Sequence, residues 1–138
     1  MITLFISREY DYALRILRAL ADAEQATVKQ VCLREHIPQA YAYKILKKLE
    51  KASLVKGFRG TNGGYRLAAP LKSVTLFDVY IAVEGDMYIG ECLRDGYICP
   101  NNKEGRQCTI HRALCQMQNH FMEAMRHRNM AEILEADR

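Results

Sequence analysis

The stretch "ECLRDGYICPNNKEGRQCTIH", residues 91–111, gathers side chains that are well suited to bind a metal. Cys92, Cys99 and Cys108 are spaced C-x6-C-x8-C, and His111 follows the last of them. Glycine, asparagine, proline and charged residues fill the gaps, which is typical of a loop that buries little of itself. Thiols in such a loop gain nothing from packing and are open to oxidation, so the pattern favours metal-binding thiolates.

Two kinds of metal site compete for these thiols. Structural zinc prefers cysteine pairs that are about two to four residues apart, whereas the gaps here are six and eight. Iron–sulfur clusters also use thiolates and tolerate wider spacing, because the bridging sulfides enlarge the site. The spacing alone prefers a cluster only modestly, and both interpretations stay open at this point.

The rest of the composition bounds the compartment. The N-terminal "MITLFISREYDYALR" has no basic leader and no small-residue cleavage site. No apolar run approaches the roughly 20 residues of a membrane span. We therefore expect a cytoplasmic protein with no membrane partner, whose five cysteines indicate metal binding or reactivity rather than disulfides. Cys32 is expected to pack in the core as a small apolar side chain.

The net charge of +4 hides a strong asymmetry along the chain. Residues 39–72 carry eight basic side chains against Glu50 alone. Residues 1–38 carry five of each sign, and residues 73–138 carry seven basic and ten acidic side chains. Positive charge concentrated in one quarter of the chain predicts a surface that binds a polyanion.

Apolar periodicity places this basic quarter on a helix and a hairpin. Helices are predicted over residues 8–21, from Thr27 to a break at Pro38, and over residues 39–53. Thr27 and Gln30 have the spacing of a capping box at the start of the second helix. Two short helices joined by a tight turn, the second one basic on its outer side, indicate a helix-turn-helix.

Strands are predicted over residues 54–58 and 65–69, with the glycine-rich turn "RGTNGG" between them. A basic hairpin directly after a recognition helix is the wing of a winged helix. The fold class is therefore mainly α with a small β-wing. We expect a winged helix-turn-helix domain over residues 1–72, followed over residues 73–138 by a cysteine loop and a long dimerisation helix.

That last helix is predicted to run from Thr109 to Ala136. Apolar side chains repeat along it at alternating spacings of four and three, which is typical of a seam against another helix. In a chain this small, the same helix of a second subunit is a plausible partner, so we expect a homodimer. The predicted seam consists of Ile110, Leu114, Met117, Phe121 and Ala124.

The predicted DNA contacts follow from position on the recognition helix and wing. Lysines mostly bind phosphates, and the residues near the helix N-terminus are better placed to meet base edges. An unshielded arginine at the wing tip suits the narrow minor groove of A/T-rich DNA. The predicted DNA-binding residues are Gln39, Ala40, Tyr41, Tyr43, Lys44, Lys47, Lys48, Arg59 and Gly60.

The stretch "YKILKKLEKASLVKGFRGTNGGYRLAAP", the segment "DYALR" and the cysteine spacing resemble the Rrf family of bacterial winged-helix regulators, which contains IscR, NsrR and CymR. The resemblance covers essentially the whole chain. It implies a homodimer, an operator in duplex DNA and a ligand-controlled switch. The recognition helix departs from the IscR-like members, because Tyr43 and Lys44 stand where those offer a carboxylate and an amide.

The resemblance also implies the cofactor. An iron–sulfur cluster, 2Fe-2S or 4Fe-4S, would be held by Cys92, Cys99 and Cys108. The fourth ligand would be His111, at the C-x2-H spacing of IscR-like members, or Asp11 of the other subunit, which aligns with the acid of the NsrR-like "DYALR". The cluster would set the DNA affinity of a repressor by sensing iron, redox state or nitric oxide. Cys115 is not explained by the resemblance.

Two other classes of protein remain open. One is a repressor without a cluster that works through a protein partner, as the resemblance to CymR allows. The other is an enzyme such as a thiol redox protein, but the sequence has no C-x-x-C, no glycine-rich phosphate loop and no nucleophile–base motif. We therefore expect no enzyme activity and no small-molecule substrate. A two-fold dimer predicts a pseudo-palindromic operator.

Overall fold

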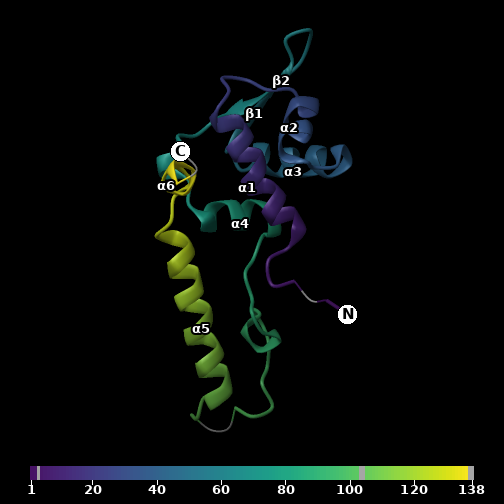
Figure 1. Ribbon diagram of the computed structural model, residues 1–138. Helices are drawn as coiled ribbons and strands as arrows, with labels where there is room; N and C mark the ends of the chain where they lie inside the picture. Colours follow the sequence, from purple (N-terminus) through teal and green to yellow (C-terminus); the bar gives the residue numbers. More distant parts are fainter. Residues whose placement is uncertain (3, 103–104, 137–138) are drawn as a thin grey trace.

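The computed structural model describes residues 1–2, 4–102 and 105–136. Its first half is a winged helix, in which three helices pack together and a two-stranded hairpin projects from them (Figure 1). This mainly helical fold with a small β-wing confirms the predicted fold class. The elements of the first half are α1 (Arg8–Ala21), α2 (Val28–Glu35), α3 (Gln39–Lys51), β1 (Val55–Phe58) and β2 (Gly64–Leu67).

Side-chain caps start the helices where the sequence predicts them. The Ser7 hydroxyl accepts the N–H of Tyr10 at 3.1 Å at the start of α1. Thr27 and Gln30 form both hydrogen bonds of a capping box at the start of α2. Such caps satisfy amides that the first turn of a helix leaves without partners. The predicted starts of α1 and α2 are confirmed.

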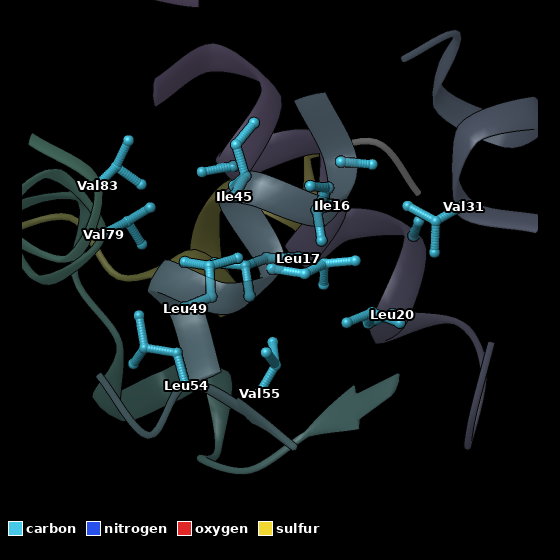
Figure 2. Close-up of a cluster of buried hydrophobic side chains, with 14 of the residues drawn as sticks. Ile16, Leu17, Leu20, Val31, Ile45, Leu49, Leu54, Val55, Val79 and Val83 are labelled. Carbon is cyan, nitrogen blue, oxygen red and sulfur yellow. The ribbon is translucent and has the colours of Figure 1, made fainter. Parts of the chain in front are cut away.

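The second half returns to the same core. Its elements are η1 (Leu71–Ser73), α4 (Leu76–Glu84), η2 (Glu91–Leu93), α5 (Thr109–Arg126) and α6 (Met130–Glu135). Helix α4 packs against α1 and α3, whereas α5 packs against α4 and η2. The core lies where α1 and α3 cross, with residues of α4 and β1 at its side (Figure 2).

The single long helix predicted over residues 109–136 was wrong, because the chain breaks after Arg126. A new helix begins at Met130, where the Asn129 side chain accepts the N–H of Glu132 at 2.9 Å. The break brings this segment against the start of α4, where Met130 donates its N–H to the carbonyl of Val74 at 2.8 Å. Met130 itself is buried, so packing against the core decides where the long helix stops.

The wing is an antiparallel hairpin whose register pairs Val55 with Leu67 and Phe58 with Gly64. Ala26 extends it by exchanging two backbone hydrogen bonds with Tyr65, at 2.9 and 2.7 Å. A Cβ at Gly64 would lie 2.5 Å from the carbonyl oxygen of Ala26. Glycine at this position therefore lets the loop before α2 pair with the start of β2, next to the turn of the wing.

Residues 85–102 and 105–126, here called the arm, extend away from this core (Figure 1), although Met87 and Met125 are buried in the core cluster. Of the eighteen residues of α5, all of them described, Met125 alone is buried. The preceding segment runs beside α5, and Ile89 donates its N–H to the Gln118 side chain at 2.9 Å. The Phe121 ring meets Phe5 edge-on at 5.2 Å. The arm is thus held by a few local contacts rather than by a core of its own.

Over the ranges 1–2, 4–102 and 105–136, no helix combines the length and the apolar character needed to cross a membrane.

Candidate nucleic-acid interface and cysteine loop

Helix α3 presents a polar face to solvent because its apolar residues recur at helical spacing. Ala42, Ile45, Leu46 and Leu49 are completely buried and fix the helix against α1. The opposite side carries most of the predicted DNA contacts. The exposed residues among them are Gln39, Ala40, Tyr41, Tyr43, Lys44 and Lys47.

Two tyrosines near the start of α3 are held in place by neighbours. The Tyr41 ring meets the ring of Tyr12, on α1, edge-on at 5.7 Å. The Gln39 side chain donates to the Tyr43 hydroxyl at 3.5 Å. These exposed rings and the Gln39 amide form an amphipathic surface at the helix N-terminus, where side chains of a recognition helix meet base edges.

Two of the predicted DNA-binding lysines bond to their own chain. The Lys44 ammonium lies 2.7 Å from Oε1 of Glu9, and the Lys48 ammonium lies 3.1 Å from Oε2. Lys48 also donates to the carbonyl of Val83 at 3.0 Å, at the end of α4. The Lys44 hydrogen bond, with that of Lys48, holds the pKa of the Glu9 carboxyl below its usual value. Sequence reasoning missed Glu9, since its partners lie 35 and 39 positions away.

The wing carries cations at its tip and on one strand face. Arg59 and Gly60 are exposed at the tip, where Gly60 has φ +102° and accepts the N–H of Gly63 at 2.9 Å. Lys56 and Arg66 lie opposite each other in the register, and both lie over the Phe58 ring, at 5.5 and 4.5 Å. The strand period of two, which places positions 56 and 58 on one face, could have indicated this pair.

The three cysteines predicted as ligands lie in the arm. Cys92 is in η2, Cys99 is in the loop that follows, and Cys108 is the N-cap residue of α5. All three are half-buried, and none of them forms a disulfide. Within the described part of the chain, no three His, Cys, Asp or Glu side chains converge closely enough to hold a metal ion.

Asn102 joins two of these cysteines. Its N–H donates to the carbonyl of Cys99 at 3.1 Å, and its side-chain oxygen accepts the N–H of Cys108 at 2.9 Å. The pKa of the Cys108 thiol is lowered chiefly by the backbone N–H of His111, then by that of Ile110, with a smaller contribution from the Cys99 side chain. The start of α5 thus favours a thiolate at Cys108. Asn102 was missed because asparagine in a polar loop is unremarkable in sequence.

The two candidates for the fourth ligand lie on different helices. His111 is half-buried in the first turn of α5. Asp11 lies on α1 and pairs with Arg15 at 3.0 Å.

The two remaining cysteines lie outside this loop. Cys115 Sγ lies 4.0 Å from the Asn119 side-chain nitrogen. Cys32 is half-buried against the core rather than fully enclosed, and burial raises the pKa of its thiol.

A helix-turn-helix with an exposed basic recognition helix and a basic wing defines the class of winged-helix DNA-binding regulators. The Rrf2 family, described as "Iron-dependent Transcriptional regulator", matches residues 6–136 of this chain. The chain therefore belongs to the Rrf2 family. It is a DNA-binding regulator of transcription and not an enzyme.

Individual relatives match this chain along nearly its whole length. Protein aau3 of Rhizobium meliloti (strain 1021) is 30% identical over 134 residues, which cover 95% of this chain and 85% of that protein. The structure of CymR, the global cysteine regulator of B. subtilis, superposes with a TM-score of 0.77 at 20% identity, covering 97% of this chain and 98% of CymR. The structure of IscR from T. potens superposes with a TM-score of 0.75 at 19% identity, covering 98% of this chain and 89% of that chain. At these identities the two structures show a shared fold.

Proposed function

We propose that this Rrf2 regulator represses transcription from a pseudo-palindromic operator as a homodimer, and that an iron–sulfur cluster on the cysteine loop controls its DNA affinity. The observation that carries the proposal is the placement of three thiols in one solvent-facing loop between the winged helix and α5. Two of them, Cys99 and Cys108, are already joined through Asn102.

The chemistry of these donors fits such a cluster. Thiolates are the usual protein ligands of iron–sulfur clusters, and the amides at the start of α5 favour the thiolate form of Cys108. Cys92, Cys99 and Cys108 would hold the cluster, with His111 as the fourth ligand and Asp11 of a second subunit as the alternative. A bound cluster would supply sensitivity to iron supply, redox state or nitric oxide.

Control of DNA binding requires that the loop and the DNA-binding surface share a structural difference between states. The loop continues into α5, and the end of α5 is tied to the start of α4 by the backbone hydrogen bonds around Val74 and Met130. Helix α4 packs on α1 and α3. Ordering the cysteine loop would therefore bias the position of α5 and, through α4, that of the recognition helix.

A homodimer is supported by one side of α5 that the chain leaves uncovered. Leu114 lies near Gly90 and Phe121 packs on Phe5, so these two of the five predicted seam residues pack against their own chain. The uncovered side repeats at spacings of three and four, as in a helix–helix seam. Its exposed residues are Ile110, Ala113, Met117, His120 and Ala124.

Anaerobic purification tests the proposal. We expect visible absorption with iron and sulfide in stoichiometric amounts, lost in Cys108→Ala, and a DNA affinity that differs between the cluster-bound and cluster-free protein. Protein that binds its operator with neither iron nor sulfide would instead support the cluster-free repressor that works through a protein partner. Comparing cluster lifetime in His111→Ala and Asp11→Ala identifies the fourth ligand.

A further inference from the structure

The carboxylate of Glu9 sits between two helices at the edge of the predicted DNA surface. Its two oxygens bind one lysine each, Lys44 at 2.7 Å and Lys48 at 3.1 Å, so that one acid of α1 engages two successive turns of α3. The Glu9 side chain is 22% exposed, compared with 59% for Lys44. The acid is thus partly shielded while the Lys44 ammonium remains open to solvent on its other side.

The two lysines differ in what else they can bind. An ammonium group has three N–H donors, and Lys48 uses two of them on Glu9 and on the carbonyl of Val83. Lys48 is therefore directed toward α1 and α4. Lys44 has one such bond, to Glu9, and it follows Tyr41 and Tyr43 on α3, all three of these residues being exposed.

We propose that Glu9 limits the sequence-independent DNA affinity of this regulator by acting as an internal counter-charge that holds Lys44 away from the phosphate backbone. Glu9 contacts no DNA in this role and is a positioning residue. The proposal rests on the assignment of α3 as the DNA-facing helix.

Electrostatics support this role. Each lysine that pairs with a phosphate displaces condensed cations from DNA, and this release supplies most of the sequence-independent binding. A carboxylate already paired with Lys44 competes with the phosphate for the same ammonium. The lowered pKa of Glu9 extends the range in which that carboxylate is ionised to more acidic solution. Glu9 does not bond to Gln39, Tyr41 or Tyr43, the residues expected to meet the bases. The counter-charge therefore weakens phosphate binding without weakening base recognition.

The test measures binding to a duplex of random sequence, so no operator is needed. Glu9→Gln keeps the shape of the side chain and removes its charge. We expect tighter binding at 50 mM salt, by about three- to tenfold, and a plot of log K against log salt that is steeper by about 0.9, the value for one added phosphate contact. Between 50 and 200 mM salt, that added slope makes the loss of affinity about 3.5-fold larger than for wild type.

Glu132→Gln is the matched control, because it makes the same charge change on the exposed side of α6. An equal gain of affinity in both variants would show an effect of net charge and overturn the proposal. Glu9→Gln should also give no gain when Lys44 is replaced by alanine. A gain that persists in the Lys44→Ala background would likewise overturn it.

A separate variant keeps this inference apart from the assignment of the DNA surface. Lys47 is exposed on α3 and does not contact Glu9, so Lys47→Ala should weaken binding and flatten the salt plot by about 0.9. Unchanged binding in Lys47→Ala overturns the surface assignment. A loss in Lys47→Ala together with an unchanged salt plot in Glu9→Gln overturns the role of Glu9 alone.

Discussion

The arm and the rest of the described chain, here called the body, differ in what determines their conformation. In the body, side-chain caps start α1, α2 and α4, and each of these helices buries at least two residues in a shared core. In the arm, the longest helix of the described chain buries Met125 alone. The body is specified by its own packing. Under the proposed function, a cluster and a second subunit would cover the thiols and apolar side chains that the arm presents.

This difference predicts a large effect of core truncation in the body and a small one in the arm. Leu46, at the centre of α3, is completely buried. Leu46→Ala should lower the free energy of unfolding by about 2–5 kcal/mol, because it removes buried methyl groups and leaves a cavity. Urea denaturation followed by circular dichroism measures the change.

Ile98→Ala is the matched truncation in the arm, where the side chain is 89% exposed. It should change the free energy of unfolding by no more than about 0.5 kcal/mol. A loss comparable to that of Leu46→Ala would mean that the cysteine loop is packed as firmly as the body, and the comparison would fail.

A charge on the uncovered side of α5 tests whether a second subunit completes the arm. Met117 is 56% exposed in the single chain. Met117→Glu would bury an unpaired charge in the dimer, at a cost of several kcal/mol. The dissociation constant of the dimer should therefore rise at least about a hundredfold, as measured by sedimentation.

Asn119→Glu adds the same charge on the opposite side of α5 and should leave the dimer intact, because helical geometry turns it about 160° away from Met117. Phe121 is a poorer choice for this test, since it packs on Phe5 of its own chain. A dimer that is unchanged in Met117→Glu would assign the subunit contact to another surface.

Local signals made much of the fold predictable. The capping pair at Thr27 and the break at Pro38 depend on residues within three or four positions, and the structure confirms them. The prediction of one long final helix failed because its end is set by backbone hydrogen bonds such as that from Met130 to Val74, 56 positions away in sequence. Periodicity shows which residues are apolar, but it does not show whether the same chain or a partner covers them.

The candidate sites divide in the same way. Thiols at unusual spacing and clustered lysines are visible in sequence because of what the residues are. Glu9 and Asn102 are ordinary residues that gain a role from contacts made only after folding, with Lys44 and Lys48 for Glu9 and with Cys99 and Cys108 for Asn102.

Asn102 offers a milder perturbation of the arm than loss of a thiol. Asn102→Ala removes the acceptor for the Cys108 N–H and keeps all three cysteines. Groups that orient metal ligands typically contribute about 10- to 100-fold to metal retention. The visible absorption of the proposed cluster should therefore decay about tenfold faster in a chelator. Replacement of the neighbouring exposed asparagine, Asn101→Ala, should leave the decay as in wild type. Equal lifetimes in the two variants would contradict a role for Asn102.

The smallest expected effect concerns the acid dependence of the body. The lysine hydrogen bonds lower the pKa of Glu9 below 4.5, its ordinary value. A carboxyl whose pKa is lower in the folded state stabilises the fold above its unfolded pKa, and this contribution disappears as the pH falls through the folded pKa. Wild type should therefore be more stable than Glu9→Gln at pH 7, and the two free energies of unfolding should converge as the pH falls below about 4.5. Urea is the suitable denaturant, because it is uncharged and does not screen the ion pairs. Glu24→Gln, at an exposed acid outside the lysine pair, controls for the change in net charge. If the wild-type and Glu9→Gln curves stay parallel from pH 7 to pH 3, the bonds from Glu9 to α3 do not stabilise the body, and the recognition helix is held by its apolar face alone.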